Sequence, residues 1–139
     1  MQQKESFGLL KTEMDGRPLV ANIDLSLGTF PRKGDFPWFL SLSTALKEID
    51  PKGLPTKVEA VALNGWEDRA EETISANTGF KYVGRVTWNG HRELLYQISD
   101  PGSAAAALQK LIENRETRPF AFRCQRDEFW EHVAGYLSA

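Results

Sequence analysis

The chain has only one cysteine, two histidines and no long apolar run among its 139 residues. A single cysteine cannot form an internal disulfide, which is typical of proteins from a reducing compartment. No apolar segment approaches the roughly 18 residues that a membrane-spanning helix requires. The first residues, Met1 to Glu5, also lack the basic and then apolar profile of a signal peptide. We therefore expect a cytoplasmic protein.

A strong charge of one sign is missing as well, since 17 Lys and Arg balance 19 Asp and Glu for a formal net charge of −2. This balance gives no electrostatic preference for duplex DNA, an RNA backbone or an anionic membrane. The 41% of hydrophobic residues is ordinary for a folded protein and excludes wholesale disorder. The length predicts a single domain over residues 1–139.

Sequence signatures of metal and catalytic sites do not occur. There is no His-x-x-His, Cys-x-x-Cys or Glu-x-x-His spacing, no glycine-rich phosphate-binding loop and no Gly-x-Ser-x-Gly elbow. Cys124 alternates with Phe120 and Phe122, which indicates a buried thiol rather than a nucleophile. The four carboxylates within 67–72 are the right ligands for a divalent cation, but a solvated helix face explains them more simply. We expect no catalytic residue, metal or cofactor.

Two turn signals predict β-hairpins. Asp15-Gly16 favours a tight turn between strands at about 6–13 and 18–27. Asn89-Gly90 favours a two-residue type I′ turn, and its flanks are rich in β-branched and aromatic residues. Further strands are predicted over 38–44, from alternation, and over 120–124.

Capping residues predict three helices. Thr56 and Glu59 have the spacing of a capping box and start a helix over 57–77, with Gly79 just beyond its end. Asp100, followed by Pro101, starts a second helix, and Asp127 caps a third. The expected buried stripe of the first helix is Val58, Ala62, Trp66, Ala70 and Ile74.

The resulting order is β-β, then β-α-β-β-α-β, then α. The central six elements match the ferredoxin-like, split βαβ arrangement, in which two helices pack on one face of an antiparallel sheet. We therefore expect an α+β, ferredoxin-like fold with an N-terminal β-hairpin and a C-terminal helix.

An ordered set of short motifs extends from Gly53 to Trp130. It comprises Gly53-Leu54-Pro55-Thr56, Glu59, Leu63-Asn64, Glu67-Asp68, Val83-Gly84-Arg85-Val86-Thr87, Asn89-Gly90, Arg92-Glu93-Leu94, Tyr96 and Asp127-x-x-Trp130. The set resembles the bacterial family called domain of unknown function 695. The resemblance implies a ferredoxin-like fold and a relationship to the regulator of ribonuclease E activity B, a protein inhibitor. It implies no catalytic residues. Gly65-Trp66 departs from the family pattern and leaves the continuity of the first helix open.

The hairpin around Asn89-Gly90 carries the candidate binding residues. Its more aliphatic face is expected against the helices, with Arg85 and Arg92 at the rim near the turn. The other face then presents Tyr82, Trp88 and His91, and exposed aromatics of this kind stack nucleic-acid bases or anchor a protein partner. In the alternative interpretation, the N-terminal hairpin or the third helix covers that face.

Three functions follow. The first is a non-enzymatic protein-interaction or regulatory module that binds another protein, or a second copy of itself, through a sheet face or edge. The second is single-stranded nucleic-acid binding through Tyr82, Trp88 and the rim arginines, which needs a basic groove. The third is an enzyme whose acid–base pair meets only in the fold. The pairs considered for it are His91 with Glu93, and His132 with Glu128.

Overall fold

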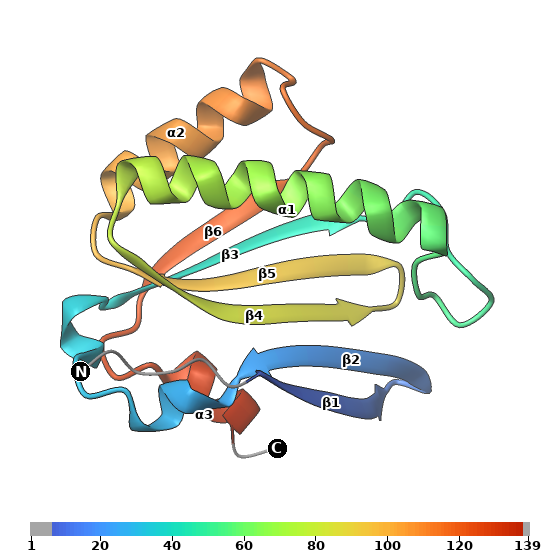
Figure 1. Cartoon of the computed structure of the whole chain (residues 1–139), viewed down its shortest axis with the longest axis horizontal. Helices are drawn as coiled ribbons and strands as arrows, with labels where there is room; N and C mark the ends of the chain where they lie inside the picture. The colour runs from blue at the N-terminus through green and yellow to red at the C-terminus, as the bar shows by residue number, and fades with distance from the viewer. Residues whose placement is uncertain (1–6, 138–139) are drawn as a thin grey trace.

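The computed structural model describes residues 7–137, which form an α+β fold with a six-stranded antiparallel sheet and three α-helices (Figure 1). The strands are β1 (Phe7–Met14), β2 (Arg17–Asp24), β3 (Trp38–Ala45), β4 (Phe80–Trp88), β5 (His91–Ile98) and β6 (Ala121–Arg126). The helices are α1 (Lys57–Asn77), α2 (Pro101–Glu113) and α3 (Glu131–Leu137), with the short 3₁₀ helices η1 (Leu25–Thr29) and η2 (Lys33–Asp35).

Both predicted hairpin turns are confirmed. Asp15 and Gly16 have φ angles of 53° and 76°, and Asn89 and Gly90 have 48° and 77°. Two consecutive positive φ angles define the type I′ turn, whose twist matches that of the flanking strands. These turns fix the registers in which Met14 pairs with Arg17 and Trp88 pairs with His91.

The helix caps also agree with the sequence. The Thr56 hydroxyl accepts the Glu59 amide, Asp100 accepts the Ser103 amide, and Asp127 accepts the Glu131 amide. Each bond satisfies one of the amides that a first helical turn leaves without an internal partner. Helix α1 has the predicted bounds and continues through Gly65.

The expected buried face of α1 is partly wrong. Val58 and Ala62 are exposed, whereas Glu59 is only 3% exposed. The Glu59 carboxylate does not complete the capping box but binds the Arg118 guanidinium and the Lys47 amide. The buried stripe of α1 is Glu59, Leu63, Trp66, Ala70 and Ile74.

The sheet order is β1-β2-β4-β5-β3-β6, and every neighbouring pair is antiparallel. This order differs from a four-stranded ferredoxin-like sheet because the N-terminal hairpin joins the sheet beside β4. The hairpin therefore adds two strands at the edge of the sheet instead of packing across one of its faces. Among residues 7–137, no helix combines the length and the apolar character required to cross a membrane.

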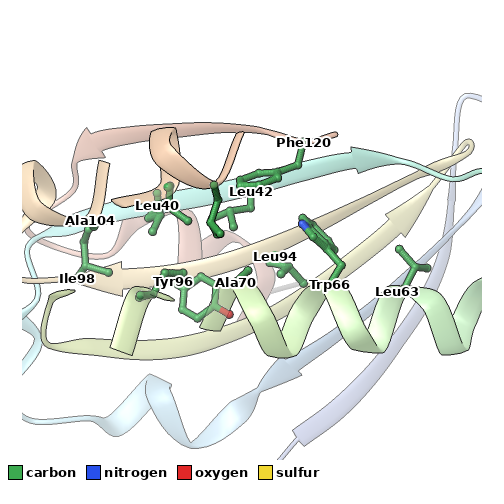
Figure 2. Packing of buried hydrophobic residues seen from close by; sticks show 13 residues of the cluster. Leu40, Leu42, Leu63, Trp66, Ala70, Leu94, Tyr96, Ile98, Ala104 and Phe120 are labelled. Atoms are coloured by element: carbon green, nitrogen blue, oxygen red, sulfur yellow. The ribbon is translucent and has the colours of Figure 1, made fainter. Parts of the chain in front are cut away.

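Two hydrophobic cores lie on opposite faces of the sheet. The first core joins α1 and α2 to alternate residues of β3 and β5, among them Leu40, Leu42 and Leu94 (Figure 2). The second core places Trp130 and Val133 against Phe39 and Leu95, whose side chains point the other way. The sheet face without α1 and α2 is therefore covered in part by α3, as the alternative interpretation of the sequence expected.

A β-bulge in β4 corrects the expected position of Tyr82. Tyr82 pairs with Tyr96 and Gly84 pairs with Leu95, so Val83 is an extra residue between the two pairs. One inserted residue moves the preceding side chains to the opposite face. Tyr82 therefore packs against the first core beneath α1, not on the face without helices.

Substitution of Gly84 by alanine is expected to lower the free energy of unfolding by about 1–3 kcal/mol. A Cβ at this position would collide with the backbone carbonyl oxygen of Asn22 and with Ile23, so that β2 and β4 must separate. Thermal and urea unfolding measure the effect. The matched control is Gly65→Ala, because a Cβ there meets open space on α1. This change should raise the free energy of unfolding by about 0.5–1 kcal/mol. Equal effects of the two changes would contradict the close approach at Gly84.

Candidate functional site

A groove of about 670 Å³ lies between α1 and the β1, β4 and β5 strands, on the helix-bearing face of the sheet. We call it the α1–β4 groove. Its lining residues are Phe7, Asn64, Glu67, Asp68, Glu71, Phe80, Lys81, Tyr82, Arg85 and Tyr96. The groove exists because α1 covers the centre of the sheet, while the β1–β2 hairpin extends beyond the helix.

A connected row of aromatic rings belongs to this groove. The ring centroids of Phe7 and Tyr82 are 5.9 Å apart, those of Tyr82 and Tyr96 are 5.3 Å apart, and those of Tyr96 and Phe80 are 5.9 Å apart. Burial raises the pKa of Tyr82 to about 12 and also raises the pKa of Tyr96. Both phenols are therefore protonated at neutral pH, and the Tyr96 hydroxyl donates to Glu71 at 3.3 Å.

Glu67 of α1 joins the two predicted rim arginines. Its carboxylate lies 3.2 Å from Arg85 Nη1 and 2.9 Å from Arg92 Nη1. Arg92 is buried and also donates through Nε to the Thr87 hydroxyl at 2.8 Å. Burial lowers the pKa of the Arg92 guanidinium and Glu67 opposes that shift, so the buried cation depends on this carboxylate.

Replacing Glu67 with glutamine is expected to cost about 2–3 kcal/mol of unfolding free energy, because it leaves the Arg92 charge buried without a counter-charge. Chemical denaturation of the variant measures the loss. Glu72→Gln is the matched control, since Glu72 is mostly exposed and lies 3.7 Å from Arg69, in a pair worth about 0–1 kcal/mol. A loss for Glu67→Gln no larger than for Glu72→Gln would show that the buried guanidinium does not need its partner.

The structure does not place Tyr82 on one face with Trp88 and His91, as the sequence predicted. Tyr82, Arg85 and Arg92 lie on the helix-bearing face, where two of them line the α1–β4 groove and Arg92 pairs with Glu67. Trp88 and His91 lie at the β4–β5 turn. The Trp88 indole donates to the Met14 carbonyl oxygen at 2.9 Å, and the His91 ring lies 3.1 Å from the Asn89 carbonyl oxygen.

One of the histidine pairs considered for an enzyme, His132 with Glu128, also differs from expectation. His132 Nδ1 lies 3.0 Å from Asp127, not beside Glu128, which instead pairs with Arg126. The second ring nitrogen of His132 lies 3.0 Å from the Gln125 amide. Both ring nitrogens thus contact neighbouring side chains at the start of α3. Within residues 7–137, no three His, Cys, Asp or Glu side chains gather as a metal site.

Cys124 is partly buried against the first core, and burial raises the pKa of its thiol. A raised pKa disfavours the thiolate, which is the nucleophilic form. This agrees with the structural role expected from its alternation with phenylalanines.

The outer strand β1 is a feature that the sequence argument missed. Among residues 7–137, its only strand partner is β2, so its other side is an edge of the sheet. Phe7, Leu9 and Met14 are 42%, 61% and 43% exposed, respectively. The sequence did carry a signal, because both faces of this strand are apolar near its start. A hairpin that covered the sheet would need apolar side chains on one face only.

Comparison with known proteins gives a family and no function. No curated protein and no solved structure matches the chain. The relationship to the regulator of ribonuclease E activity B therefore stays an expectation. The family model described as Family of unknown function (DUF695) matches residues 8–138. Because this match covers nearly the whole sequence, the chain belongs to that family of unknown function.

Proposed function

We propose that this chain is a protein-interaction module that binds an extended segment of a partner protein along β1. The observation that carries the proposal is the eight-residue β1 edge, which exposes Phe7 and Leu9 beside the α1–β4 groove. Addition of a strand to a sheet edge is a common way to bind peptides, because backbone hydrogen bonds supply affinity and alternate side chains supply specificity.

The sequence of β1 lacks most features that protect an edge strand from pairing. Natural edges are blocked by proline, by bulges or by several charged residues. β1 contains no proline, its register with β2 is continuous, and its first four residues are uncharged. Lys11 and Glu13 carry its only charges, near the turn.

The register indicates which amides of β1 face outward. Residues that flank a two-residue turn form a hydrogen-bonded pair, and hydrogen-bonded pairs alternate with non-bonded ones. Because Met14 and Arg17 flank the turn, the amides of Leu9, Lys11 and Glu13 point away from β2. A partner strand pairing there places alternate side chains beside Phe7 and Leu9, so we expect its sequence to have apolar residues at every second position.

Selection of random ten-residue peptides against the folded chain tests the proposal. We expect enriched peptides with alternating apolar residues, and binding that weakens at least about tenfold in Lys11→Pro. Proline removes one outward amide and leaves the β1–β2 ladder in place. The control Lys11→Thr removes the same charge but retains the amide, and it should bind like the wild type. Failure to enrich peptides, or equal binding by both variants, would refute strand addition at β1.

The same observations make the nucleic-acid alternative less favourable. Single-strand binding requires arginines that are free to contact phosphates and aromatic faces on which bases stack. Arg85 and Arg92 are instead paired with Glu67, and Tyr82 is half-buried beneath α1. We retain a regulatory role and a cytoplasmic location as parts of the proposal, and the single cysteine supports the location.

We also infer that β3 to β6, with α1 and α2, form a ferredoxin-like unit to which the N-terminal hairpin was added. The order β4-β5-β3-β6 within the sheet, with both helices in the first core, supports this assignment. In this description β1 and β2 extend that unit at its β4 side, and they supply the proposed binding edge.

A further inference from the structure

Helix α1 carries a second apolar stripe, on a side that faces away from the first core. Val58 and Val61 are 68% and 73% exposed, and Ala62 and Gly65 are exposed as well. These four positions have the spacing i, i+3, i+4 and i+7, which places them on one face of a helix. We call this surface the outer α1 stripe. None of its residues belongs to β1, so an inference from it is independent of the proposed strand addition.

Helix α2 covers a different part of α1. It lies beside the C-terminal half, where Thr73, Ala76 and Asn77 of α1 share a hollow with α2 residues (Figure 1). The outer α1 stripe is in the N-terminal half, where its apolar side chains are open to solvent. Contiguous apolar side chains on a surface mark sites of association, whereas single exposed ones are ordinary. The stripe is therefore a candidate interface.

The outer α1 stripe is complementary in shape to a second copy of itself. Val58 protrudes near one end of the stripe, whereas Gly65 leaves open space near the other, since a Cβ there would meet no atom within 4 Å. Ala62 and Gly65 also line a hollow of about 340 Å³ beside the stripe. When two copies pack antiparallel about a twofold axis between Val61 and Ala62, each Val58 lies opposite Gly65 of the other copy.

The charges beside the stripe favour the same antiparallel arrangement. Lys57 and Asp68 are exposed and have no ion pair with any described residue. They are about three helical turns apart, so both lie on the same flank of the stripe. In an antiparallel pair this flank faces its own copy in reverse order, which brings each Lys57 near Asp68 of the other copy. A parallel pair would instead place like charges side by side, which repel.

We infer that the outer α1 stripe is the interface of a symmetric homodimer in which two α1 helices pack antiparallel. Burial of Val58 and Val61 drives the association, because their exposed side chains leave water. The ion pairs between Lys57 and Asp68 set the orientation. An interface made by half of one helix is small, so the dimer forms reversibly, with a Kd of about 10–100 µM.

Reversal of the two flanking charges tests the orientation, with the dimer Kd measured by analytical ultracentrifugation of the full chain. Lys57→Glu and Asp68→Lys should each weaken the dimer about fivefold or more, because each places like charges opposite one another. The double variant restores both ion pairs with their signs exchanged, so it should dimerise like the wild type. A double variant that dimerises no better than the single variants would overturn the antiparallel arrangement.

Substitution of Val61 by glutamate tests the interface itself, in the same sedimentation experiment. Val61 is 73% exposed, so the change leaves folding intact, which far-UV circular dichroism checks, but it places a charge at the centre of the dimer. Dimerisation should weaken at least about tenfold. Phe129→Glu is the matched control, because Phe129 is 78% exposed and lies outside α1. A wild-type chain that stays monomeric well above the expected Kd, or equal Kd values for the two variants, would overturn the inference.

Discussion

Replacing Arg118 with methionine is expected to lower the free energy of unfolding by about 3–5 kcal/mol, which is a large fraction of the stability of a domain of this size. Glu59 is only 3% exposed, and the change removes the cation that lies beside its carboxylate. The pair also joins residues far apart in the chain, since Glu59 lies on α1 and Arg118 lies just before β6. Urea unfolding at neutral pH measures the loss.

The pH dependence distinguishes this explanation from a simple loss of packing. The Arg118 hydrogen bonds lower the pKa of Glu59 from 4.5 to about 2, so folding favours the ionised carboxylate. The stabilisation is therefore complete above pH 4.5 and is lost as the pH falls toward about 2. The deficit of Arg118→Met should shrink over the same range, because the wild type then loses the stabilisation that its Arg118–Glu59 pair provides. A deficit that is constant between pH 6 and about 2 would contradict the assigned role of the pair.

A double variant provides the control. Glu59→Gln combined with Arg118→Met leaves no uncompensated charge in the interior, so it should regain part of the stability lost in Arg118→Met alone. Its stability should also lack the change between pH 4.5 and 2 that Glu59 causes in the wild type. A double variant less stable than Arg118→Met would indicate that the cost comes from the shape of the site and not from the charge.

Replacing Trp130 with alanine is expected to cost about 3–5 kcal/mol of unfolding free energy. Trp130 is 1% exposed and stacks on Phe30 at 5.5 Å, and in the second core it lies with Leu27 of η1, Val133 of α3 and residues of the sheet. Its indole donates to the carbonyl oxygens of Lys33 and Phe36. Its φ angle is +57°, which is unfavourable for a bulky residue, so packing must exceed this backbone strain.

Trp130→Phe separates packing from hydrogen bonding. It keeps an aromatic ring but removes the indole donor from two carbonyl oxygens, of which the Lys33 oxygen still accepts from the Phe36 amide and the Phe36 oxygen still accepts from Gln97. The expected loss is about 1–2 kcal/mol, well below that of the alanine variant. Thermal unfolding monitored by far-UV circular dichroism compares the two. Equal losses would mean that the indole hydrogen bonds, and not ring burial, hold α3 against the sheet.

The elements set by local chemistry could be predicted from the sequence. Thr56 and Asp100 start helices through their own side chains, and Asn89-Gly90 makes a turn that depends on two residues alone. Asp127 likewise caps the third helix. In each case the deciding interaction lies within about four residues, so no knowledge of the rest of the chain is needed.

The features that distant segments decide could not be predicted in this way. Glu59 is buried because Arg118, which lies 59 residues later in the chain, binds its carboxylate. Helical periodicity alone instead predicts that the neighbouring Val58 is buried. Tyr82 lies on the other face because Val83 is an extra residue in β4, a strand that pairs with both β2 and β5. The bulge also places Tyr82 on the other face from the one expected for it, away from the predicted binding residue Trp88.

Backbone amide exchange in β1 is the most direct test of the proposed interaction. The measurement compares the free chain with its complex with a selected peptide, residue by residue, using NMR. Strand addition predicts that the outward amides of Leu9, Lys11 and Glu13 gain protection on binding, while the amides already paired with β2 change little. Protection that appears instead along β6, or a β1 strand whose exchange is unchanged in the complex, would contradict the account.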